Sequence, residues 1–597
     1  MEKMNRYLFS VIICTVLLFY AIPAFSVSAP FYSPPQTSGS IPVRLYPTEH
    51  VSLGKPTLVT FGMPFTRGSI TESDLDTVRL ISGGNTGIEI YIDQLSTWRH
   101  VSDTAFNGTS VRVARLQFVY TFSVSYPDYE TITLEWGMKN RTNNRSIFQN
   151  PRSAWHLVES GTYEAEDNVF EPDVYAVLPK EILCNGSIST TRMLPFDDSV
   201  SEKREAPEVF ERIQNKHGYE IMDHAQHNFF FTIINRDNSR VKTGNQCPYK
   251  TMYEPWLYDR STAMYMLYMR SGSISSLREA VRNTQFYKNN LYDDTASLSR
   301  FTGLFKLKNP ALEGYPTGNG AMYSYNECLA YTYWLTCDED MLNPIEWVVN
   351  AHERNDEATR WYPSIAFWTE RHTALRLLAN TVAYEITGKD VYRDSLISQY
   401  GDFIWHQNGA GGMLPDDRID GGLWHFGSQH GDGGEKALVA SSWMTVLTVN
   451  AMVRAYAFTE DRDIADFIRR TGDFELAACK RDEMHSYGAG PLWYCDYMVR
   501  SDGSSEVRSG HTIEHSLEIA SAVAWAAYFA DLLNADDEPY INCADKLFAS
   551  YKAGVQYWIR PNAPNERNTV YRVSPWRKYG WEYRPSGSLS WIMNNLK

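Results

Sequence analysis

The sequence predicts a multidomain β + α protein, in which an N-terminal β barrel or sandwich region is followed by an (α/α) toroid. Its length of 597 residues exceeds what one hydrophobic core usually holds, so we expect two or three domains. Apolar residues alternate with polar ones up to about residue 250, which is the period of half-buried strands. Beyond that point they recur every three or four residues, as in amphipathic helices. The change of period predicts a domain boundary at residue 250.

Residues 1 to 28 predict an export signal. Lys3 and Arg6 precede an apolar run from Tyr7 to Phe25, and Ala24-Phe25-Ser26 offers small residues for a signal peptidase. The run is also close to the length that spans a bilayer, so an uncleaved anchor is the alternative. We expect cleavage, a secreted or periplasmic protein, and no stable membrane insertion of the mature chain.

Residues 40 to 250 are expected to form the β barrel or sandwich region, as one or two β units. Gly83-Gly84-Asn85 and Asn107-Gly108 carry turn-forming residues between the expected strands. The alternating apolar residues are Ile88, Ile90 and Ile92, then Leu116, Phe118, Tyr120 and Phe122, then Ile132, Leu134 and Trp136. Short strands with such turns are typical of all-β architectures.

Residues 251 to 560 are expected to form the toroid, from about ten antiparallel helices in pairs. Ser276 and Glu279 match a capping box, and an apolar stripe from Leu375 to Ile386 stops at Gly388. Turns between paired helices are expected at Ser271-Gly272, Thr387-Gly388 and Glu460-Asp461, and further helices over 320–336, 437–458, 512–534 and 540–558. Residues 561 to 597, rich in Pro, Arg, Trp and Tyr, predict a non-helical closing segment.

Composition excludes some function classes and favours carbohydrate. The net charge of −15 argues against general affinity for nucleic acid or anionic lipid. Aromatic residues make up 14% of the chain, and aromatic faces stack readily on sugars. Seven of the eight cysteines follow the signal and none forms a CxxC pair, so no disulfide framework is expected. One or two bridges could still form after export.

Two stretches resemble a known family. Val59-Thr60-Phe61-Gly62-Met63-Pro64-Phe65-Thr66-Arg67-Gly68, followed by Trp98-Arg99 and Ser110-Val111-Arg112-Val113, resembles the RIFT-barrel-like N-terminal domain of exo-rhamnogalacturonan lyase-like proteins. Trp256-Leu257-Tyr258-Asp259-Arg260 resembles the start of toroids in related bacterial carbohydrate-active proteins. The resemblance covers residues 40 to 560 and implies a polysaccharide lyase. It carries no catalytic residue onto this chain, so the chemistry has to come from candidate sites.

The first candidate cluster surrounds a predicted helix start. Elimination from a uronate requires a base, an acid for the leaving oxygen, and a group that stabilises the enolate. Arg371 could bind the substrate carboxylate while His372 acts as base or neutraliser. Trp361 and Tyr362 are expected to bind sugar. The structural alternative is that Arg371 faces solvent and His372 packs or caps.

The second cluster precedes a long predicted helix and lies among glycines, which allow close backbone approach. Trp424 is predicted as a sugar platform. His425 is predicted as a catalytic residue and His430 as a substrate contact. The alternative is an ordinary polar turn.

The third cluster is His511-Thr512-Ile513-Glu514-His515, which matches H-x-x-E-H. No third metal ligand is evident, so neither a metal nor another cofactor is predicted, with a divalent cation as the alternative. His511 is predicted as catalytic and His515 as substrate-binding. Tyr487 is predicted as the general acid, with Trp493 and Tyr494 as sugar contacts.

Asn326 is the last candidate, as a neutraliser of the substrate carboxylate beside Tyr323 and Tyr325. Its alternative is a capped helix with a core-facing aromatic residue. Together, the candidates predict an exported polysaccharide lyase that cleaves a uronic-acid-containing polysaccharide by β-elimination, with this acidic polysaccharide as its partner.

Two other functions stay open. A glycoside hydrolase on the same toroid would use paired carboxylates such as Glu370, Asp432, Glu435 or Glu514. A non-catalytic glycan-binding envelope protein would have a cleft lined by Trp and Tyr without a converging acid and base.

Overall fold

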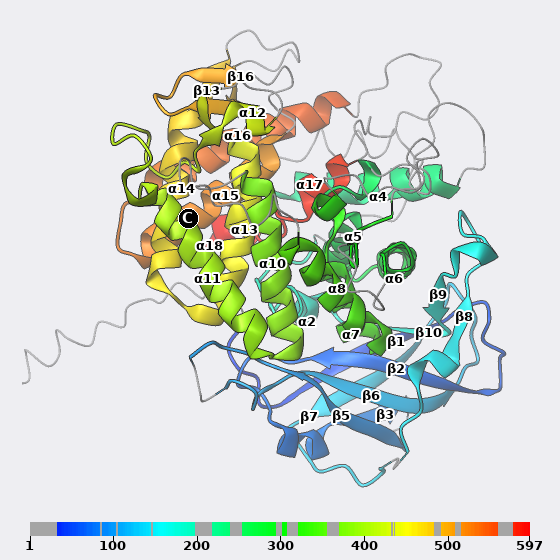
Figure 1. The fold of residues 1–597 in the computed structure, drawn as a ribbon. Helices are drawn as coiled ribbons and strands as arrows, with labels where there is room; N and C mark the ends of the chain where they lie inside the picture. Colours follow the sequence, from blue (N-terminus) through cyan, green and yellow to red (C-terminus); the bar gives the residue numbers. More distant parts are fainter. Residues whose placement is uncertain are drawn as a thin grey trace, which may run out of the picture.

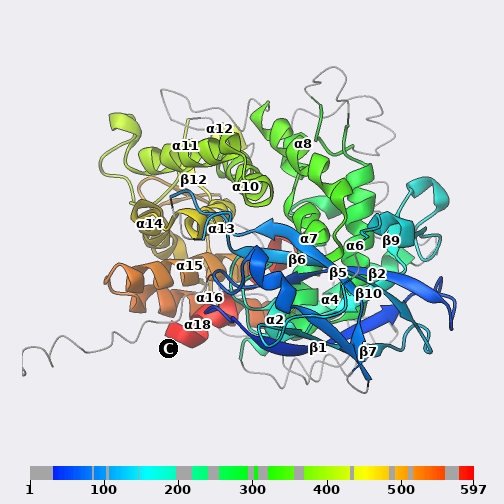
Figure 2. The same cartoon turned by 90° about the horizontal axis from the view of Figure 1, so that it is seen from below.

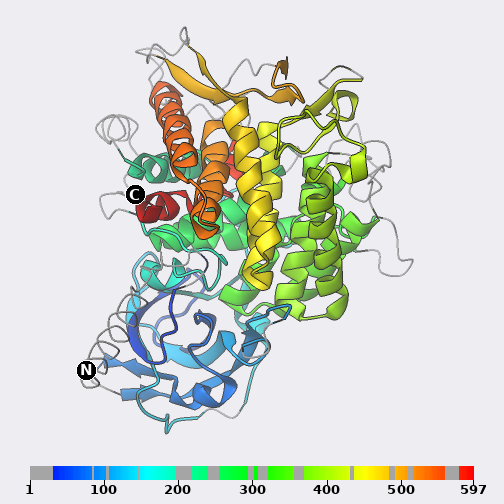
Figure 3. The same ribbon diagram turned by 90° about the vertical axis from the view of Figure 1, so that its left-hand side faces the viewer.

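The chain folds into N-terminal β-sheets and a larger helical region, and the sheets lie against one end of the helices (Figures 1 and 3). This confirms the predicted order of β structure followed by helices. The computed structural model describes residues 31, 33–83, 86–102, 106–144, 147–196, 218–238, 254–293, 301–306, 320–354, 369–430, 434, 436–482, 491–507, 515–558 and 577–596. Within these ranges, every helix is too short or too polar to cross a bilayer.

The N-terminal region contains a five-stranded and a three-stranded antiparallel sheet, which Figure 2 views from below. The first has the order β10 (Val174–Val177), β1 (Gly39–Pro47), β7 (Glu130–Trp136), β3 (Arg79–Ser82), β4 (Thr86–Ile88). The second has the order β2 (Pro56–Pro64), β6 (Val111–Thr121), β5 (Ile90–Thr97), and β8 (Trp155–Leu157) pairs separately with β9 (Phe170–Pro172). The register places Ile90 opposite Phe118 and Ile92 opposite Leu116. The predicted strands are therefore confirmed in β5 and β6, but residues Val111 to Phe118 of β6 are buried on both faces, Gln117 included, so this strand is not half-buried as expected.

Most helices form consecutive pairs in contact. The pairs are α5 (Arg260–Ser271) with α6 (Ile274–Asn289), α7 (Glu327–Thr336) with α8 (Leu342–Glu353), α10 (Glu370–Thr387) with α11 (Asp390–Gln407), α13 (Ser442–Thr459) with α14 (Arg462–Ala478), and α15 (Ser516–Leu532) with α16 (Glu538–Trp558). The first helix of each pair contacts the first helix of the next. The short helix α17 (Lys578–Tyr583) contacts both α15 and α5. We call α5, α7, α10, α13, α15 and α17 the ring helices.

The turns between paired helices lie where the sequence predicts them. α5 ends at Gly272 and α10 at Gly388, and both glycines have φ of 66°, which suits a left-handed helix cap. α13 ends at Glu460, and Asp461 begins the next helix by accepting a hydrogen bond from the Asp463 N–H. The remaining helices are α2 (Lys180–Leu183), α4 (Glu220–Asn238), α12 (Gly427–His430) and α18 (Leu589–Leu596).

Three sequence expectations need correction. The segment predicted as non-helical contains α17 and α18, because its apolar side chains, such as Trp591 and Ile592, are buried. α4 lies inside the predicted β region, since its aromatic residues are consecutive and do not alternate. The expected capping box at Ser276 is also wrong: Ser273 is the N-cap and Ser276 is buried one turn further on.

Short strands between the helices are β11 (His425–Phe426), β12 (Leu438–Ala440), β13 (Cys479–Asp482), β14 (Leu492–Cys495), β15 (Met498–Arg500) and β16 (Ser505–Val507).

The C-terminal ends of α10 and α13 face the N-terminal region. The Tyr384 hydroxyl near the end of α10 donates to the His100 carbonyl oxygen, and the Val101 N–H donates to the Phe458 carbonyl oxygen at the end of α13. The N-terminal ends of α10 and α13 therefore lie at the end of the helical region that is remote from the sheets.

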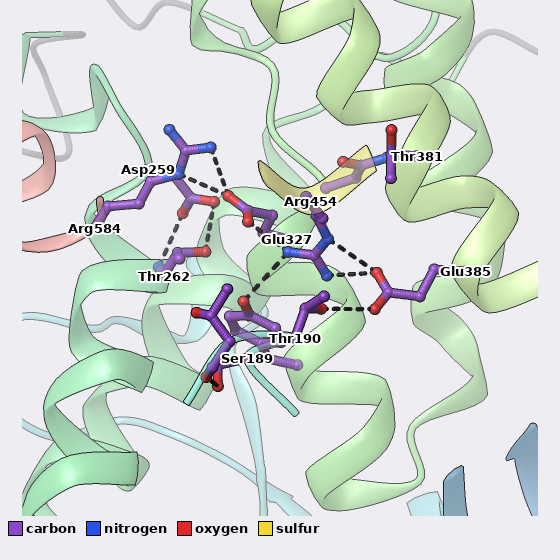
Figure 4. Close-up of polar contacts among 12 residues, drawn as sticks. Ser189, Thr190, Asp259, Thr262, Glu327, Thr381, Glu385, Arg454 and Arg584 are labelled. Carbon is purple, nitrogen blue, oxygen red and sulfur yellow. Dashed lines mark hydrogen bonds and ion pairs between the residues drawn. The ribbon is translucent and has the colours of Figure 1, made fainter. Parts of the chain in front are cut away.

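Five charged side chains from different elements meet inside the ring helices, and Figure 4 labels four of them, Glu327, Glu385, Arg454 and Arg584. Arg454 on α13 donates to Glu385 on α10 at 2.5 Å and to Glu327 on α7 at 2.6 Å. Arg584 also binds Glu327 at 2.6 Å, and Arg112 on β6 binds Glu385. Arg112 and Glu385 have completely buried side chains, so the network joins the sheets to the helices through their interior. A cavity of about 40 Å³ beside it has space for water.

Gly62 on β2 marks a second close approach between the two regions. A Cβ atom at this position would lie 1.7 Å from the Trp334 carbonyl oxygen on α7, and a backbone atom cannot rotate away. We expect Gly62→Ala to lower the free energy of unfolding by about 1–3 kcal/mol, the usual cost of overpacking. Urea unfolding followed by circular dichroism measures this. Gly83→Ala is the control, because a Cβ there meets nothing within 4 Å. Equal stability of the two variants would contradict the close approach.

Candidate active site

Aromatic side chains from several elements converge at the N-terminal ends of the ring helices. Trp443 in the first turn of α13 stacks on His515, the N-cap of α15, with ring centroids 4.9 Å apart and planes 16° apart. The His515 ring lies 4.6 Å from Trp581 on α17. Tyr258 and Tyr497 each lie 5.7 Å from Trp443. We call these five residues the aromatic cluster.

The backbone around Trp443 and Tyr497 is held by polar contacts. The Ser441 N–H donates to Glu370 Oε1 at 2.9 Å, which ties the start of α13 to α10. The Ser441 hydroxyl donates to the Tyr497 carbonyl oxygen at 2.9 Å. Glu370, a sequence candidate for a catalytic carboxylate, is therefore buried in a structural contact, and burial raises its pKa.

The backbone at Tyr258 has an unusual conformation. Tyr258 has φ of 71° and Asp259 has φ of 57°, which side-chain-bearing residues rarely adopt. The Asp259 carboxylate accepts hydrogen bonds from the Thr262 N–H at 3.0 Å and its hydroxyl at 2.7 Å, capping α5. Gly580 on α17 leaves no room for a Cβ, which would lie 2.8 Å from the Tyr258 carbonyl oxygen. Strained residues of this kind concentrate at functional sites.

Cationic side chains surround the aromatic cluster. The Arg371 guanidinium lies 5.3 Å from the centroid of the Trp443 ring and 6.0 Å from that of Tyr258. The Arg577 guanidinium lies 5.2 Å from the Trp581 ring. These distances are within the range of cation–π attraction. The cluster therefore has positive charge at its edge, in a protein whose net charge is −15.

One carboxylate is hydrogen-bonded to the cluster. His515 Nδ1 lies 2.5 Å from Glu518 Oε1, one turn further along α15, and the Glu518 side chain is only 3% exposed. A buried carboxylate bonded to an imidazole is a common arrangement for proton transfer, because each group can hold the proton in turn.

Several buried polar atoms of the cluster and its surroundings have no hydrogen-bond partner among the described residues. They are Tyr258 Oη, Arg371 Nε, Trp443 Nε1 and Trp581 Nε1. Burial raises the pKa of Tyr258 to about 12, so its hydroxyl keeps its proton at neutral pH. Leaving such groups unsatisfied costs free energy, and a ligand with hydroxyl or carboxylate oxygens would remove that cost.

Arg371 and His515 are the predicted site residues that the structure brings together. His372, the predicted base, is buried, and burial together with the charge of Arg371 lowers its pKa to about 3. It is therefore uncharged at neutral pH and cannot neutralise a carboxylate. A base of such low pKa is also poorly matched to a reaction near neutral pH. We correct the prediction for His372 on these grounds.

His372 should instead make the protein sensitive to acid. Between its ordinary pKa of 6.5 and about 3, the unfolded chain binds a proton that the folded chain does not. The free energy of unfolding should therefore fall as the pH decreases, by about 1.4 kcal/mol per pH unit for this group. We expect His372→Gln to flatten this slope between about pH 6 and pH 4, measured from urea unfolding midpoints.

His156 supplies the control for this experiment. Burial lowers the pKa of His156, but hydrogen bonds to Asp173 and Glu171 outweigh burial and raise it. Its stabilising effect is present below the unfolded pKa and is lost as the pH rises through the folded pKa. His156→Gln should thus cost most stability in acid, the opposite of His372→Gln. Parallel pH profiles for the two variants would contradict both assignments.

Three other predicted residues are buried in structural positions, and we correct their roles. The Asn326 amide donates to the Ala379 carbonyl oxygen at 2.9 Å, which ties α7 to α10. Trp424 is completely buried and packs at 87° to the Phe474 ring, so it offers no exposed face to a sugar. His425 is also completely buried, and its Nδ1 atom lies 3.2 Å from the Leu423 carbonyl oxygen.

Trp493 and Tyr494 lie on β14, where Lys546 of α16 lies 4.4 Å from the Trp493 ring. His430 is the last residue of α12. Outside the described residues lie Trp361, Tyr362, Tyr487 and His511, as well as the carboxylates Asp432, Glu435 and Glu514.

Among the residues that the structure describes, no three His, Cys, Asp or Glu side chains form a group that could hold a metal ion. The divalent cation stays an untested alternative.

Trp443, Trp581 and Glu518 were not predicted from the sequence. Trp443 belongs to a helix whose apolar residues leave no polar face, so it is indistinguishable from a core residue. Glu518 follows His515 by three residues, a spacing that a search along helix faces would detect.

Comparison with known proteins gives weak matches. No protein-family model matches the chain, and no curated protein matches it. Among solved structures, unsaturated glucuronyl hydrolase from Streptococcus agalactiae is similar with 12% identity and a TM-score of 0.37, over 67% of this chain and 98% of that chain. Two mutant forms of that enzyme match over the same shares, also at 12% identity, with TM-scores of 0.37 and 0.36.

These matches contradict the predicted enzyme class. The solved structures are of a hydrolase, whereas the sequence analysis predicts a lyase. β-Elimination is therefore not retained. The resemblance to exo-rhamnogalacturonan lyase-like proteins gains no support from the matches, and a function for this chain has to be argued from its own residues.

Proposed function

We propose that the chain is a glycoside hydrolase on an α/α toroid, with the aromatic cluster as the binding site for a uronic-acid-containing carbohydrate. The observation that carries this proposal is the four buried donors beside the His515–Glu518 pair that have no hydrogen-bond partner within the described ranges. The contacts that run from α5 through the ring helices to α17 and back to α5 support the toroid. In such a fold, the ends of the inner helices surround the cleft.

The proposed binding mode follows from the chemistry of the cluster. The faces of Trp443 and Trp581 suit the apolar face of a sugar ring. Arg371 has an unpartnered Nε–H and can bind a carboxylate, and Arg577 adds a second positive charge. The protonated hydroxyl of Tyr258 can donate to a sugar oxygen. Among the described residues, no carboxylate pairs with Arg371, so a neutral sugar would leave its guanidinium without a counter-charge. We therefore propose an acidic sugar.

Glu518 is proposed as one of the two carboxyl groups that glycoside hydrolysis generally uses. His515 holds it in position and can exchange a proton with it. Asp259 is less suited, because its carboxylate caps α5. Glu514 directly precedes His515 and is our candidate for the second carboxyl group on sequence grounds. The proposal includes export by the signal in residues 1 to 28, since a polymeric substrate lies outside the cell.

The test is to incubate the purified mature protein with uronate oligosaccharides that have saturated or unsaturated ends. Ultraviolet absorbance detects unsaturated uronate. If the protein is a hydrolase, new reducing ends should form and this absorbance should not rise. Release of an unsaturated terminal unit would lower that absorbance. Binding without new reducing ends across rhamnogalacturonan, ulvan, alginate and glycosaminoglycan fragments would replace the hydrolase by a glycan-binding protein.

A further inference from the structure

Three cysteines that are distant in the sequence meet beside the β13–β14 hairpin. Cys479 is the first residue of β13 and lies directly opposite Cys495, the last residue of β14, in the antiparallel ladder. Cys543 lies on α16, which packs against β14. No CxxC spacing is involved, so only the fold brings the three sulfur atoms together.

The surroundings of Cys479 place it near both other cysteines. Cys479 faces Cys495 across the hairpin, and α16, which carries Cys543, packs against the same hairpin. Cys479 is partly exposed, whereas Cys495 and Cys543 are buried. Interactions with the other two thiols lower the pKa of the Cys479 thiol, and they raise the pKa values of Cys495 and Cys543. A soluble reagent would reach Cys479 first, because the other two cysteines are buried.

We propose that Cys479 is the central sulfur of an exchangeable disulfide, with Cys495 and Cys543 as alternative partners. The bridge forms by reaction with a small disulfide such as oxidised glutathione. The Cys479 thiolate attacks one glutathione sulfur and releases the other glutathione as a thiol. The thiolate of Cys495 then attacks Cys479, forms the protein disulfide and releases the second glutathione. The two protein thiols are oxidised, and one glutathione disulfide is reduced to two thiols.

The exchange step needs no further oxidant. The Cys543 thiolate attacks the Cys479 sulfur, the bond between Cys479 and Cys495 breaks, and Cys495 leaves as a thiolate that takes up the proton lost by Cys543. Bridging Cys479 to Cys495 closes the base of the hairpin. Bridging it to Cys543 attaches the hairpin to α16. The two states thus hold the strand that carries Trp493 and Tyr494 in different ways.

The test uses the full mature chain after treatment with oxidised glutathione or with a phosphine reductant. Remaining thiols are alkylated, and peptides are mapped by mass spectrometry. In the oxidised wild type, we expect Cys479 to be at least tenfold less alkylated than in the reduced protein. Cys495→Ser should form only the bridge to Cys543, and Cys543→Ser only the bridge to Cys495. Cys337→Ser is the control, because Cys337 is buried elsewhere and should leave the map unchanged.

Three results would overturn the proposal. The first is full alkylation of Cys479 in the oxidised wild type. This result uses no variant, so it does not depend on whether a variant folds. Another is a bridge between Cys495 and Cys543 in Cys479→Ser. The third is failure of either single-partner variant to oxidise while its circular dichroism spectrum matches that of the wild type, since this would show a fixed bridge or none.

Discussion

Glu518→Gln is expected to lower kcat on the hydrolysed oligosaccharide by about 10²- to 10⁴-fold, the usual contribution of a general acid or base. Glutamine keeps the size of the side chain and can still bind His515, but it cannot exchange a proton at neutral pH. KM should change little, since the stacking surface of Trp443 and the cation at Arg371 are untouched. The measurement is steady-state release of reducing ends as a function of substrate concentration.

Asp531→Asn is the matched control, because Asp531 lies near the other end of α15 and is exposed. It should retain wild-type kcat. The pH profile separates proton transfer from a structural role: Glu518→Gln should lose one limb of the wild-type dependence. Wild-type kcat in Glu518→Gln would remove Glu518 from the mechanism, even if hydrolysis itself were established.

Glu385→Ala is expected to lower the free energy of unfolding by about 3–5 kcal/mol, the usual cost of removing one partner from a buried ion pair. Glu385 holds Arg112 on one carboxylate oxygen and Arg454 on the other. Arg454 keeps Glu327, but Arg112 would be left completely buried without a counter-charge. Urea unfolding followed by tryptophan fluorescence and circular dichroism measures the change.

The control for Glu385→Ala is Glu346→Ala. Glu346 binds Lys389 at 2.7 Å, but the two side chains are 31% and 52% exposed, so solvent weakens their attraction. The expected cost is about 0.2–1 kcal/mol. If the two variants unfolded at the same urea concentration, the buried network would not hold the sheets to the helices in the way we describe.

The fold was largely accessible from residue periodicity. Alternation in residues such as Ile90 and Phe118 predicts the strands correctly. It does not predict that β6 is buried on both faces, because polar residues such as Gln117 are buried as well. The stripe ending at Gly388 predicts α10 correctly, because glycine tolerates the left-handed cap. α17 was missed because a helix of six residues is too short to show a period, and its burial depends on contacts with distant helices.

The candidate site was less accessible from the sequence. Arg371 and His515 stood out as charged or titratable residues at predicted helix starts, and the structure brings both to the aromatic cluster. Trp424 and His425 looked equally suitable, but both are completely buried. Sequence reports residue type, whereas the direction of a side chain at a helix end depends on packing between helices that are remote along the chain. Trp443 and Trp581 could be recognised only from their contacts.

The interior position of Arg112 bears on modularity. A fragment that begins at residue 254 would carry Glu385 without its partner from β6, and the α7 surface that receives Gly62 would be open to water. The two regions are therefore not exchangeable building blocks, although they differ in architecture. Recombination that grafted another β domain onto these helices would succeed only if the donor supplied a buried cation at the place of Arg112.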